Sequence, residues 1–145
     1  MTRIYGIGVD VVDVARIDRA ANRWGDRFLK RVYTERELEY CRRRSFPAEH
    51  LAARFAAKEA TMKALGTGWT PYVSFKTIEI VRQGSRRPEI ELAHETRQML
   101  PGNLSLHVSL SHTRLLATAF VVAALESEPS LNSSSIREKH HDQIH

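Results

Sequence analysis

A carboxylate within an apolar helical stripe is the first feature of the sequence that suggests chemistry. The spacing of Leu51, Phe55 and Met62 predicts one apolar face of a helix, and Glu59 falls inside that face. A buried carboxylate is costly unless a cation, a metal ion or a hydrogen-bond donor meets it. Lys63 follows one turn later and is the nearest candidate partner. Glu59 is therefore either a functional ligand or half of an ordinary helix ion pair.

A second carboxylate, Asp10, stands in a predicted strand beside two glycines. Alternation along residues 3–12 places Asp10 on the same face as Gly6 and Gly8. Glycine inside a strand often marks the close approach of a ligand or of another backbone. Asp10 could hold a metal ion beyond that surface, or it could cap the following helix, although Asp13 is the better placed cap.

Two further segments could contact phosphate groups. The predicted strand end Ser109–Thr113 contains two serines, a histidine and a threonine, all of which can donate hydrogen bonds to phosphate oxygens. The segment Gly66-Thr67-Gly68 follows the predicted helix and can bring backbone close to a ligand. Each also has an ordinary interpretation, as a polar turn and as a helix C-cap respectively.

Charge and composition limit the class of protein and of partner. The formal net charge is +5, which favours an anionic partner such as nucleic acid, a phosphorylated small molecule or an acidic protein. Arg16, Arg19 and Arg23 share one helical face, which is either a solvated surface or a dock for an acidic helix. We expect neither a membrane span nor a signal sequence. A lone cysteine, Cys41, excludes an intrachain disulfide and suits a reducing cytoplasm.

Hydrophobic periodicity and the residues typical of helix ends predict the elements that position these residues. At 145 residues, the chain is predicted to form one domain, residues 1–126, followed by a disordered polar tail, 127–145. A capping box at Thr34–Glu37 starts one helix, and the central helix opens near Pro47 and stops at Gly66. The predicted strands cover 3–12, 72–82, 89–92, 104–110 and 115–125, the last one central, with a short helix over 93–100.

The combined motifs resemble those of holo-acyl-carrier-protein synthases, the small bacterial 4'-phosphopantetheinyl transferases. The segments that carry the resemblance are Gly6–Asp10, the long stretch Arg54–Gly68, and Ser109–Thr113, and the similarity runs from about residue 3 to residue 125. The resemblance implies an α+β fold in which a long helix packs on an antiparallel sheet. It also implies a homotrimer with active sites between neighbouring subunits.

The activity implied by the resemblance is a magnesium-dependent group transfer. Such enzymes transfer 4'-phosphopantetheine from coenzyme A to a serine of apo-acyl carrier protein and release adenosine 3',5'-bisphosphate. Asp10 and Glu59 match the Mg²⁺ ligands of the family. Glu59 would also accept the serine proton, directly or through a metal-bound water, and Lys63 would stabilise or protonate the departing phosphate.

The resemblance also assigns binding residues. Those expected to line the nucleotide and phosphates of coenzyme A are Arg54, Lys58, Gly66, Thr67, Gly68, His112 and Thr113. The arginine face of Arg16, Arg19 and Arg23 would meet the acidic carrier protein. The carrier could serve fatty-acid biosynthesis or polyketide synthesis, and the sequence leaves this choice open.

Two other functions remain as alternatives. A non-catalytic nucleic-acid-binding module would use the arginine face, but it would give Asp10 and Glu59 no purpose, and exposed aromatic platforms between the basic residues are lacking. A different Mg²⁺-dependent phosphotransferase or nuclease would share the two carboxylates. Both rank below the transferase.

Overall fold

The computed structural model describes residues 1–84 and 86–127, so the predicted tail lies outside the described residues from position 128 onward. In chain order the elements are β1 (Arg3–Asp13), α1 (Val14–Trp24), α2 (Asp26–Val32), α3 (Glu35–Arg42), α4 (Pro47–Leu65), a 3-10 turn (Phe75–Thr77), β2 (Ile78–Val81), β3 (Glu89–Leu92), α5 (His94–Gln98), β4 (Leu104–His112) and β5 (Leu116–Leu125). The predicted α+β fold, with a long helix on an antiparallel sheet, is confirmed.

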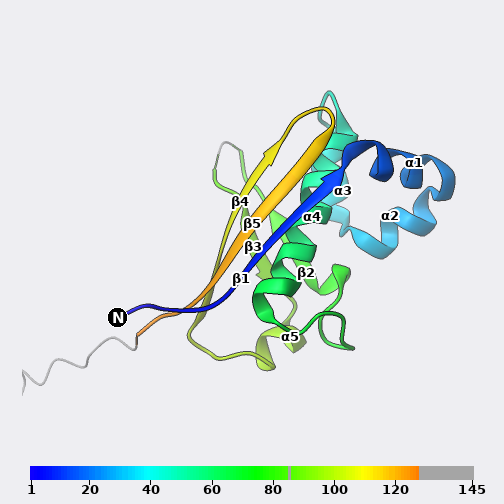
Figure 1. The fold of residues 1–145 in the computed structure, drawn as a ribbon. Coiled ribbons are helices and arrows are strands. Elements are labelled where there is room, and N and C mark those ends of the chain that lie inside the picture. The colour runs from blue at the N-terminus through cyan, green and yellow to red at the C-terminus, as the bar shows by residue number, and fades with distance from the viewer. Residues whose placement is uncertain (85, 128–145) are drawn as a thin grey trace, which may run out of the picture.

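The main sheet has three antiparallel strands in the order β1-β5-β4, with α4 packed across one face (Figure 1). The strand β5 is central, as its nearly continuous apolar sequence predicted. Its register pairs Ala119 with Asp10 on one side and with Leu110 on the other. Asp10 therefore lies on the helix-facing side of an edge strand, where its side chain can reach α4.

Two glycines of β1 allow the close contact between this strand and α4. A Cβ atom added at Gly6 would lie 1.9 Å from the carbonyl oxygen of Ala64, and one at Gly8 would lie 1.8 Å from that of Ala60. No side chain fits in either position. The sequence predicted the close approach of a ligand or of another backbone at these glycines, and the structure shows the backbone of α4. This packing holds Asp10 against the helix.

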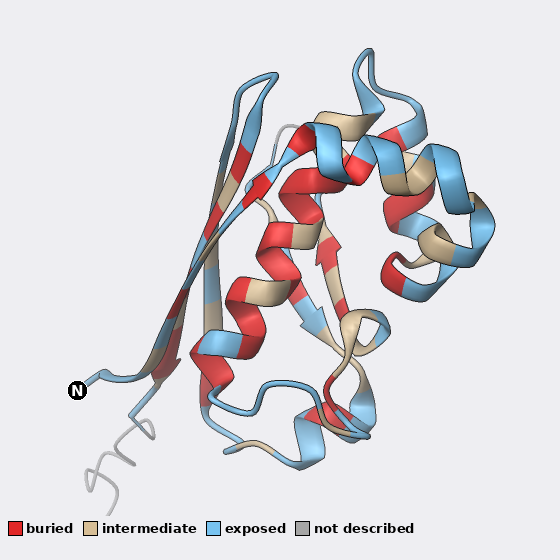
Figure 2. Ribbon diagram, turned by 45° about the vertical axis from the view of Figure 1, so that its right-hand side comes forward, coloured by how far each residue is buried: buried red, intermediate tan, exposed pale blue. Residues whose placement is uncertain are grey.

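The long helix α4 begins at Pro47 and ends before Gly66, as predicted. Gly66 adopts the left-handed conformation at φ +73°, and its N–H donates to the carbonyl oxygens of Met62 and Lys63. The helix is buried on most sides and not along one stripe, because it packs between the sheet and the elements α1, α3 and β2 (Figure 2). Even Arg54 and Lys58 on this helix are buried.

Three local predictions need correction. The expected strand over 72–82 is limited to Ile78–Val81, because a 3-10 turn precedes it, in which Ser74 N–H donates to Thr77 Oγ1. The strand β4 continues through His112, two residues beyond its predicted end. Asp13 occupies the N-cap position of α1, but its side chain makes no capping hydrogen bond. The capping box at Thr34 and Glu37 is present as predicted.

The sheet face turned away from α4 carries exposed apolar side chains. Ile7, Val9 and Val11 on β1 are more than half exposed, and Phe120, the β5 partner of Val9, is 46% exposed. Such a contiguous apolar surface is typical of a surface that another protein covers. Within residues 1–84 and 86–127, no helix is long and apolar enough to cross a membrane.

Candidate active site

The fold brings Asp10, Glu59 and Lys63 together where β1 crosses α4. The Lys63 ammonium donates to Asp10 Oδ1 at 3.1 Å and to the carbonyl oxygen of Val9 at 2.9 Å. Burial raises the pKa of Glu59, and the nearby Asp10 carboxylate raises it further. Among the described residues the ion-pair partner of Lys63 is Asp10, and not Glu59 one turn away as the helix spacing predicted. Glu59 is left as a half-buried carboxylate facing a second one.

This pair of carboxylates suits a magnesium ion. Mg²⁺ prefers oxygen ligands and keeps several waters, so one or two carboxylates suffice to hold it. Burial raises the pKa of Glu59 most, and repulsion by Asp10 adds to it; a divalent cation held by both carboxylates would relieve that repulsion. In the described part of the chain, no third histidine, cysteine, aspartate or glutamate completes a larger metal-binding cluster. The donor set therefore fits Mg²⁺ better than a metal that requires an all-protein cage.

Arg16 lies closer to this site than the sequence indicated. The positive charge of Arg16 lowers the pKa of Glu59, as does that of Lys63, although burial and Asp10 outweigh both. The sequence assigned Arg16 only to the basic face of α1. The packing of α1 against α4 places its first turn beside the carboxylates, so Arg16 also adds positive potential to the site.

A second group of candidate residues surrounds an arginine-rich pocket of about 420 Å³, which we call the arginine pocket. Arg54 is 3% exposed, its Nε has no hydrogen-bond partner among the described residues, and its guanidinium stacks 4.1 Å from the centre of the Tyr40 ring. The other charged side chains that line the pocket are Arg36, Glu39, Arg43, Arg44 and Arg82. Arg36 pairs with Glu79 and Glu91, and Arg43 pairs with Glu39. The remaining guanidinium groups of the lining, those of Arg44, Arg54 and Arg82, favour a ligand with phosphate groups.

Most residues of the arginine pocket were not predicted from the sequence, although some of them form a visible basic run. The run Arg42–Arg44 was visible as the basic end of a helix. Arg36 shares a helical face with Tyr40 and Arg43, four and seven residues later. Arg82 joins them only because the β2–β3 hairpin packs against α3 and α4, and no local pattern predicts that packing. Arg54 is the one residue of the pocket that the sequence assigned to coenzyme A.

His112 lies at the end of β4 near the first turns of α4. Its Nδ1 is 3.5 Å from Glu49 Oε2, and its ring centre is 5.1 Å from that of His50. Burial lowers the pKa of His50, and the charges of His112, Arg54 and Arg44 lower it further. His50, which the sequence did not single out, therefore connects His112 electrostatically to the arginine pocket.

The remaining residues expected to bind coenzyme A lie in different places. Gly66, Thr67 and Gly68 form an exposed segment at the far end of α4 from Arg54, with Gly68 at φ +59°. Thr113 Oγ1 accepts hydrogen bonds from the backbone N–H groups of Leu115 and Leu116, so this hydroxyl shapes the β4–β5 turn. One chain therefore does not gather all the predicted residues around a single ligand.

The structure contradicts a direct contact between Lys58 and coenzyme A. The side chain is fully buried, and its ammonium donates to Glu37 and to the carbonyl oxygens of Phe75 and Ile78. All three N–H bonds of the ammonium have partners inside the protein. The motif residue beside Glu59 therefore faces the core, because α4 is buried on several sides.

The arginine face of α1 is exposed, as predicted, and it continues onto an aromatic residue. Arg19 and Arg23 border a surface hollow of about 560 Å³ beside Trp24, which is 49% exposed. The Arg23 guanidinium lies 4.9 Å from the centre of the Trp24 ring. The sequence missed Trp24, which gives this basic surface an apolar centre.

Comparisons with known proteins show the family to which the chain is related. The family model described as the 4'-phosphopantetheinyl transferase superfamily matches residues 6–124. The holo-[acyl-carrier-protein] synthase of Syntrophus aciditrophicus is 41% identical over 121 residues, which cover 82% of this chain and 94% of the relative. That of Koribacter versatilis is 42% identical over 121 residues, covering 82% and 97%.

Solved structures of similar proteins show the same fold. The crystal structure of holo-[acyl-carrier-protein] synthase from Neisseria meningitidis superposes with a TM-score of 0.77 at 38% identity, covering 83% of this chain and 98% of the other. The Helicobacter pylori enzyme of the same name, solved in complex with coenzyme A, gives a TM-score of 0.71 at 35% identity, covering 81% and 98%.

Proposed function

This chain belongs to the 4'-phosphopantetheinyl transferase superfamily, and we infer from this that it is a holo-acyl-carrier-protein synthase. Such an enzyme transfers 4'-phosphopantetheine from coenzyme A to a serine of apo-acyl carrier protein. The serine oxygen forms a new bond to the phosphorus that carries the pantetheine arm. The bond from that phosphorus to the rest of the diphosphate breaks, and we propose that adenosine 3',5'-bisphosphate leaves.

The observation that carries the proposed mechanism is the meeting of Asp10, Glu59 and Lys63. Asp10 and Glu59 would hold Mg²⁺, which neutralises charge on the phosphate oxygens during transfer. Glu59 would also accept the serine proton, directly or through a metal-bound water. Lys63 is half exposed and is held by Asp10 and by the backbone of Val9, so its charge can stabilise the departing phosphate.

We propose that the arginine pocket binds the nucleotide end of coenzyme A. The support is the orphan Nε of buried Arg54 and the four further arginines around the pocket. Guanidinium groups bind phosphates in pairs of parallel hydrogen bonds, which suits a 3'-phosphate and a diphosphate. His112 would add a donor from the neighbouring strand end.

We further propose that the complete site lies between two subunits of a homotrimer. Arg54 and Gly66 are twelve residues apart on α4, a distance of roughly 18 Å along the helix axis. A second chain that supplied one of these two ends would bring the predicted residues around one ligand. The exposed apolar face of β1 and β5 offers a surface for such an association.

The acidic partner would dock on the exposed arginines of α1. Arg19 and Arg23 flank Trp24, so the surface combines positive charge with an apolar anchor. A single buried cysteine, Cys41, suits the reducing cytoplasm in which we propose that the enzyme works.

The test is the intact mass of apo-acyl carrier protein after incubation with this protein, coenzyme A and Mg²⁺. We expect the mass to rise by one 4'-phosphopantetheine, and chelation of the metal to stop the reaction. Glu59→Gln should slow transfer by about 100-fold or more, because it removes a metal ligand and a proton acceptor without changing shape. Asp10→Asn should do the same, and the two losses should not add, since either change empties one site.

The matched control is Asp26→Asn. Asp26 pairs with Lys30 one turn later on an exposed helix, and such a pair contributes about 0.3–0.5 kcal/mol to stability. Loss of this ion pair in Asp26→Asn should leave the rate of transfer unchanged. If Glu59→Gln behaves like Asp26→Asn and keeps its dependence on magnesium, the metal-site assignment is refuted.

A further inference from the structure

A buried ion pair lies outside the catalytic group and has no part in the mechanism above. Lys58 Nζ is 2.7 Å from Glu37 Oε1, and both side chains are fully buried. The same ammonium donates to the carbonyl oxygens of Phe75 at 2.7 Å and Ile78 at 2.6 Å. It thus joins α4 to α3 and to the start of β2.

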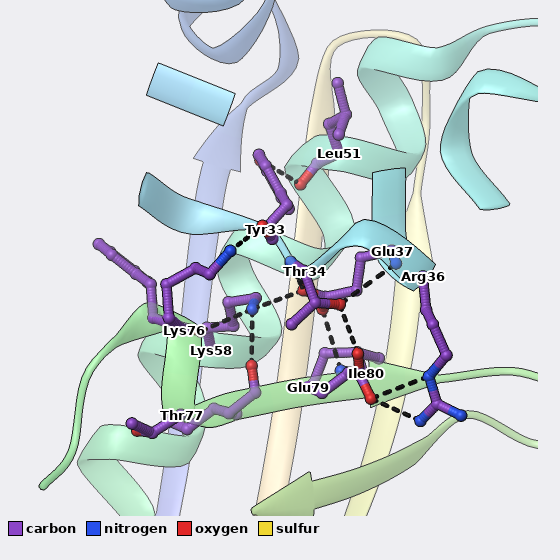
Figure 3. Close-up of polar contacts among 12 residues, drawn as sticks. Tyr33, Thr34, Arg36, Glu37, Leu51, Lys58, Lys76, Thr77, Glu79 and Ile80 are labelled. Atoms are coloured by element: carbon purple, nitrogen blue, oxygen red, sulfur yellow. Dashed lines mark hydrogen bonds and ion pairs between the residues drawn. The ribbon is translucent and has the colours of Figure 1, made fainter. Parts of the chain in front are cut away.

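The Glu37 carboxylate extends these connections. Its Oε1 accepts from the backbone N–H of Thr34 at 2.8 Å, which closes the capping box of α3. Its Oε2 accepts from the backbone N–H of Ile80 at 3.0 Å, in the middle of β2 (Figure 3). The pair therefore fixes three elements to one another through directional bonds.

These three elements are the ones that line the arginine pocket. Arg54 precedes Lys58 by one turn of α4, and Tyr40 follows Glu37 by nearly one turn of α3. Ile80, which donates to Glu37, itself lines the pocket, as do the neighbouring residues of the β2–β3 hairpin. The ion pair lies directly behind the pocket wall and does not enter the pocket.

Stability alone does not explain such a pair. Two apolar residues of similar volume often stabilise a core as well as a buried ion pair does. They could not, however, bind Phe75, Ile78 and Ile80 through directional hydrogen bonds, so β2 would be free to shift along α3 and α4. Burial lowers the pKa of Lys58 and the Glu37 carboxylate opposes that shift, so the charge of Lys58 depends on Glu37.

We propose that Lys58 and Glu37 are positioning residues that set the affinity for coenzyme A. They would do so by fixing the separation of Arg54 on α4, Tyr40 on α3 and Arg82 on the hairpin. This inference rests on the proposed function of the arginine pocket. It assigns to Lys58 a role behind the nucleotide site, in place of the direct contact expected from the sequence.

The test compares Lys58→Met, Glu37→Gln and a matched control, Thr61→Val. Thr61 is fully buried on the same helix, but its Oγ1 donates only to Ala57 of that helix, so its loss destabilises α4 without releasing β2. We expect Lys58→Met to raise KM for coenzyme A about tenfold and to leave KM for the carrier and kcat within about twofold. Glu37→Gln should give a smaller rise, and Thr61→Val none.

Calorimetric binding of adenosine 3',5'-bisphosphate provides a readout that does not require transfer. Affinity for this probe should fall in Lys58→Met and in Glu37→Gln by the same factors as KM rises. If both variants bind it as tightly as Thr61→Val, the positioning role is overturned. Failure of the proposed function would look different, because the wild-type protein itself would then transfer nothing.

Discussion

The charge state of Glu59 links the candidate site to stability. Burial and the Asp10 carboxylate raise its pKa above the ordinary 4.5. At pH values just above 4.5, Glu59 in the folded protein therefore holds a proton that the same residue in the unfolded chain has released. The metal-free protein should lose stability as pH rises through this range, because the charged form of Glu59 is disfavoured in the fold.

Thermal unfolding in the presence of a chelator checks this sign. The wild-type melting temperature should fall relative to that of Glu59→Gln between pH 4.5 and neutral pH. Added Mg²⁺ should restore the wild type and leave the variant unchanged. Parallel curves for the two proteins at every pH would show that Glu59 does not face Asp10 as described.

Individual residues were predictable where they broke a local pattern. Asp10 and Glu59 were singled out because Glu59 interrupts an apolar helical face and Asp10 shares a strand face with two glycines. The structure places both carboxylates close to Lys63, and their role remains a prediction. The partner of Lys63 was not predictable. Helix spacing indicates Glu59, but in the structure Lys63 donates to Asp10 and to the backbone of Val9 on β1, which is distant in sequence. Lys58 was misassigned for a similar reason, since its three partners come from distant segments.

At the scale of elements, the contact of β1 with α4 holds the two carboxylates together. Gly8→Ala would place a Cβ 1.8 Å from the carbonyl oxygen of Ala60, so the strand must move away from the helix. We expect this change to lower the free energy of unfolding by about 2–3 kcal/mol. It should also raise the Mg²⁺ concentration needed for half-maximal transfer, because Asp10 moves with the strand.

Gly102→Ala is the control for this substitution. A Cβ at Gly102 would meet nothing within 4 Å, so its effect should stay within about 1 kcal/mol. Denaturant unfolding of both variants gives the comparison. Equal stabilities for Gly8→Ala and Gly102→Ala would contradict the close packing of strand and helix.

Elements with strong punctuation were predictable, and those shaped by tertiary contacts were not. Pro47 and Gly66 mark the two ends of the central helix, and the apolar sequence of β5 indicates that this strand is central. The segment before Ile78 looks like a strand by composition. It forms a 3-10 turn instead, because Ser74 and Thr77 are hydrogen-bonded to each other. The Lys58 ammonium also donates hydrogen bonds to the carbonyl oxygens of Phe75 and Ile78.

On the scale of the whole molecule, the arginine face of α1 predicts salt-sensitive recognition of an acidic carrier. Since Arg16 also acts on Glu59, the double variant Arg19→Ala/Arg23→Ala separates docking from chemistry. It should raise KM for the carrier about tenfold and leave KM for coenzyme A unchanged. The wild-type KM for the carrier should climb with ionic strength, because exposed charges are screened.

Steady-state kinetics over a range of salt concentrations provides the measurement. The KM for coenzyme A, determined in the same reactions, is the internal control. A carrier KM that is independent of salt, or equal in the wild type and the double variant, would exclude docking by charge on this face.

The association of chains was visible in the sequence only through resemblance, because periodicity shows which residues share a face but not what covers it. The structure adds a physical reason to expect association: an exposed apolar sheet face and predicted ligand residues at both ends of α4. A chain ending at Glu126 should therefore still form a trimer by light scattering. Phe120→Lys, on the exposed face, should give a monomer, because burying an unpaired ammonium between subunits is costly.

The monomer should also lose transfer activity, since each chain would keep its carboxylates but lack the neighbour that completes the nucleotide site. Met99→Lys is the matched control, because Met99 is 63% exposed at the end of α5 and belongs to no strand. It should leave both the trimer and the activity intact. Light scattering and the transfer assay on the same samples give the result, and a fully active Phe120→Lys monomer would refute a site shared between subunits.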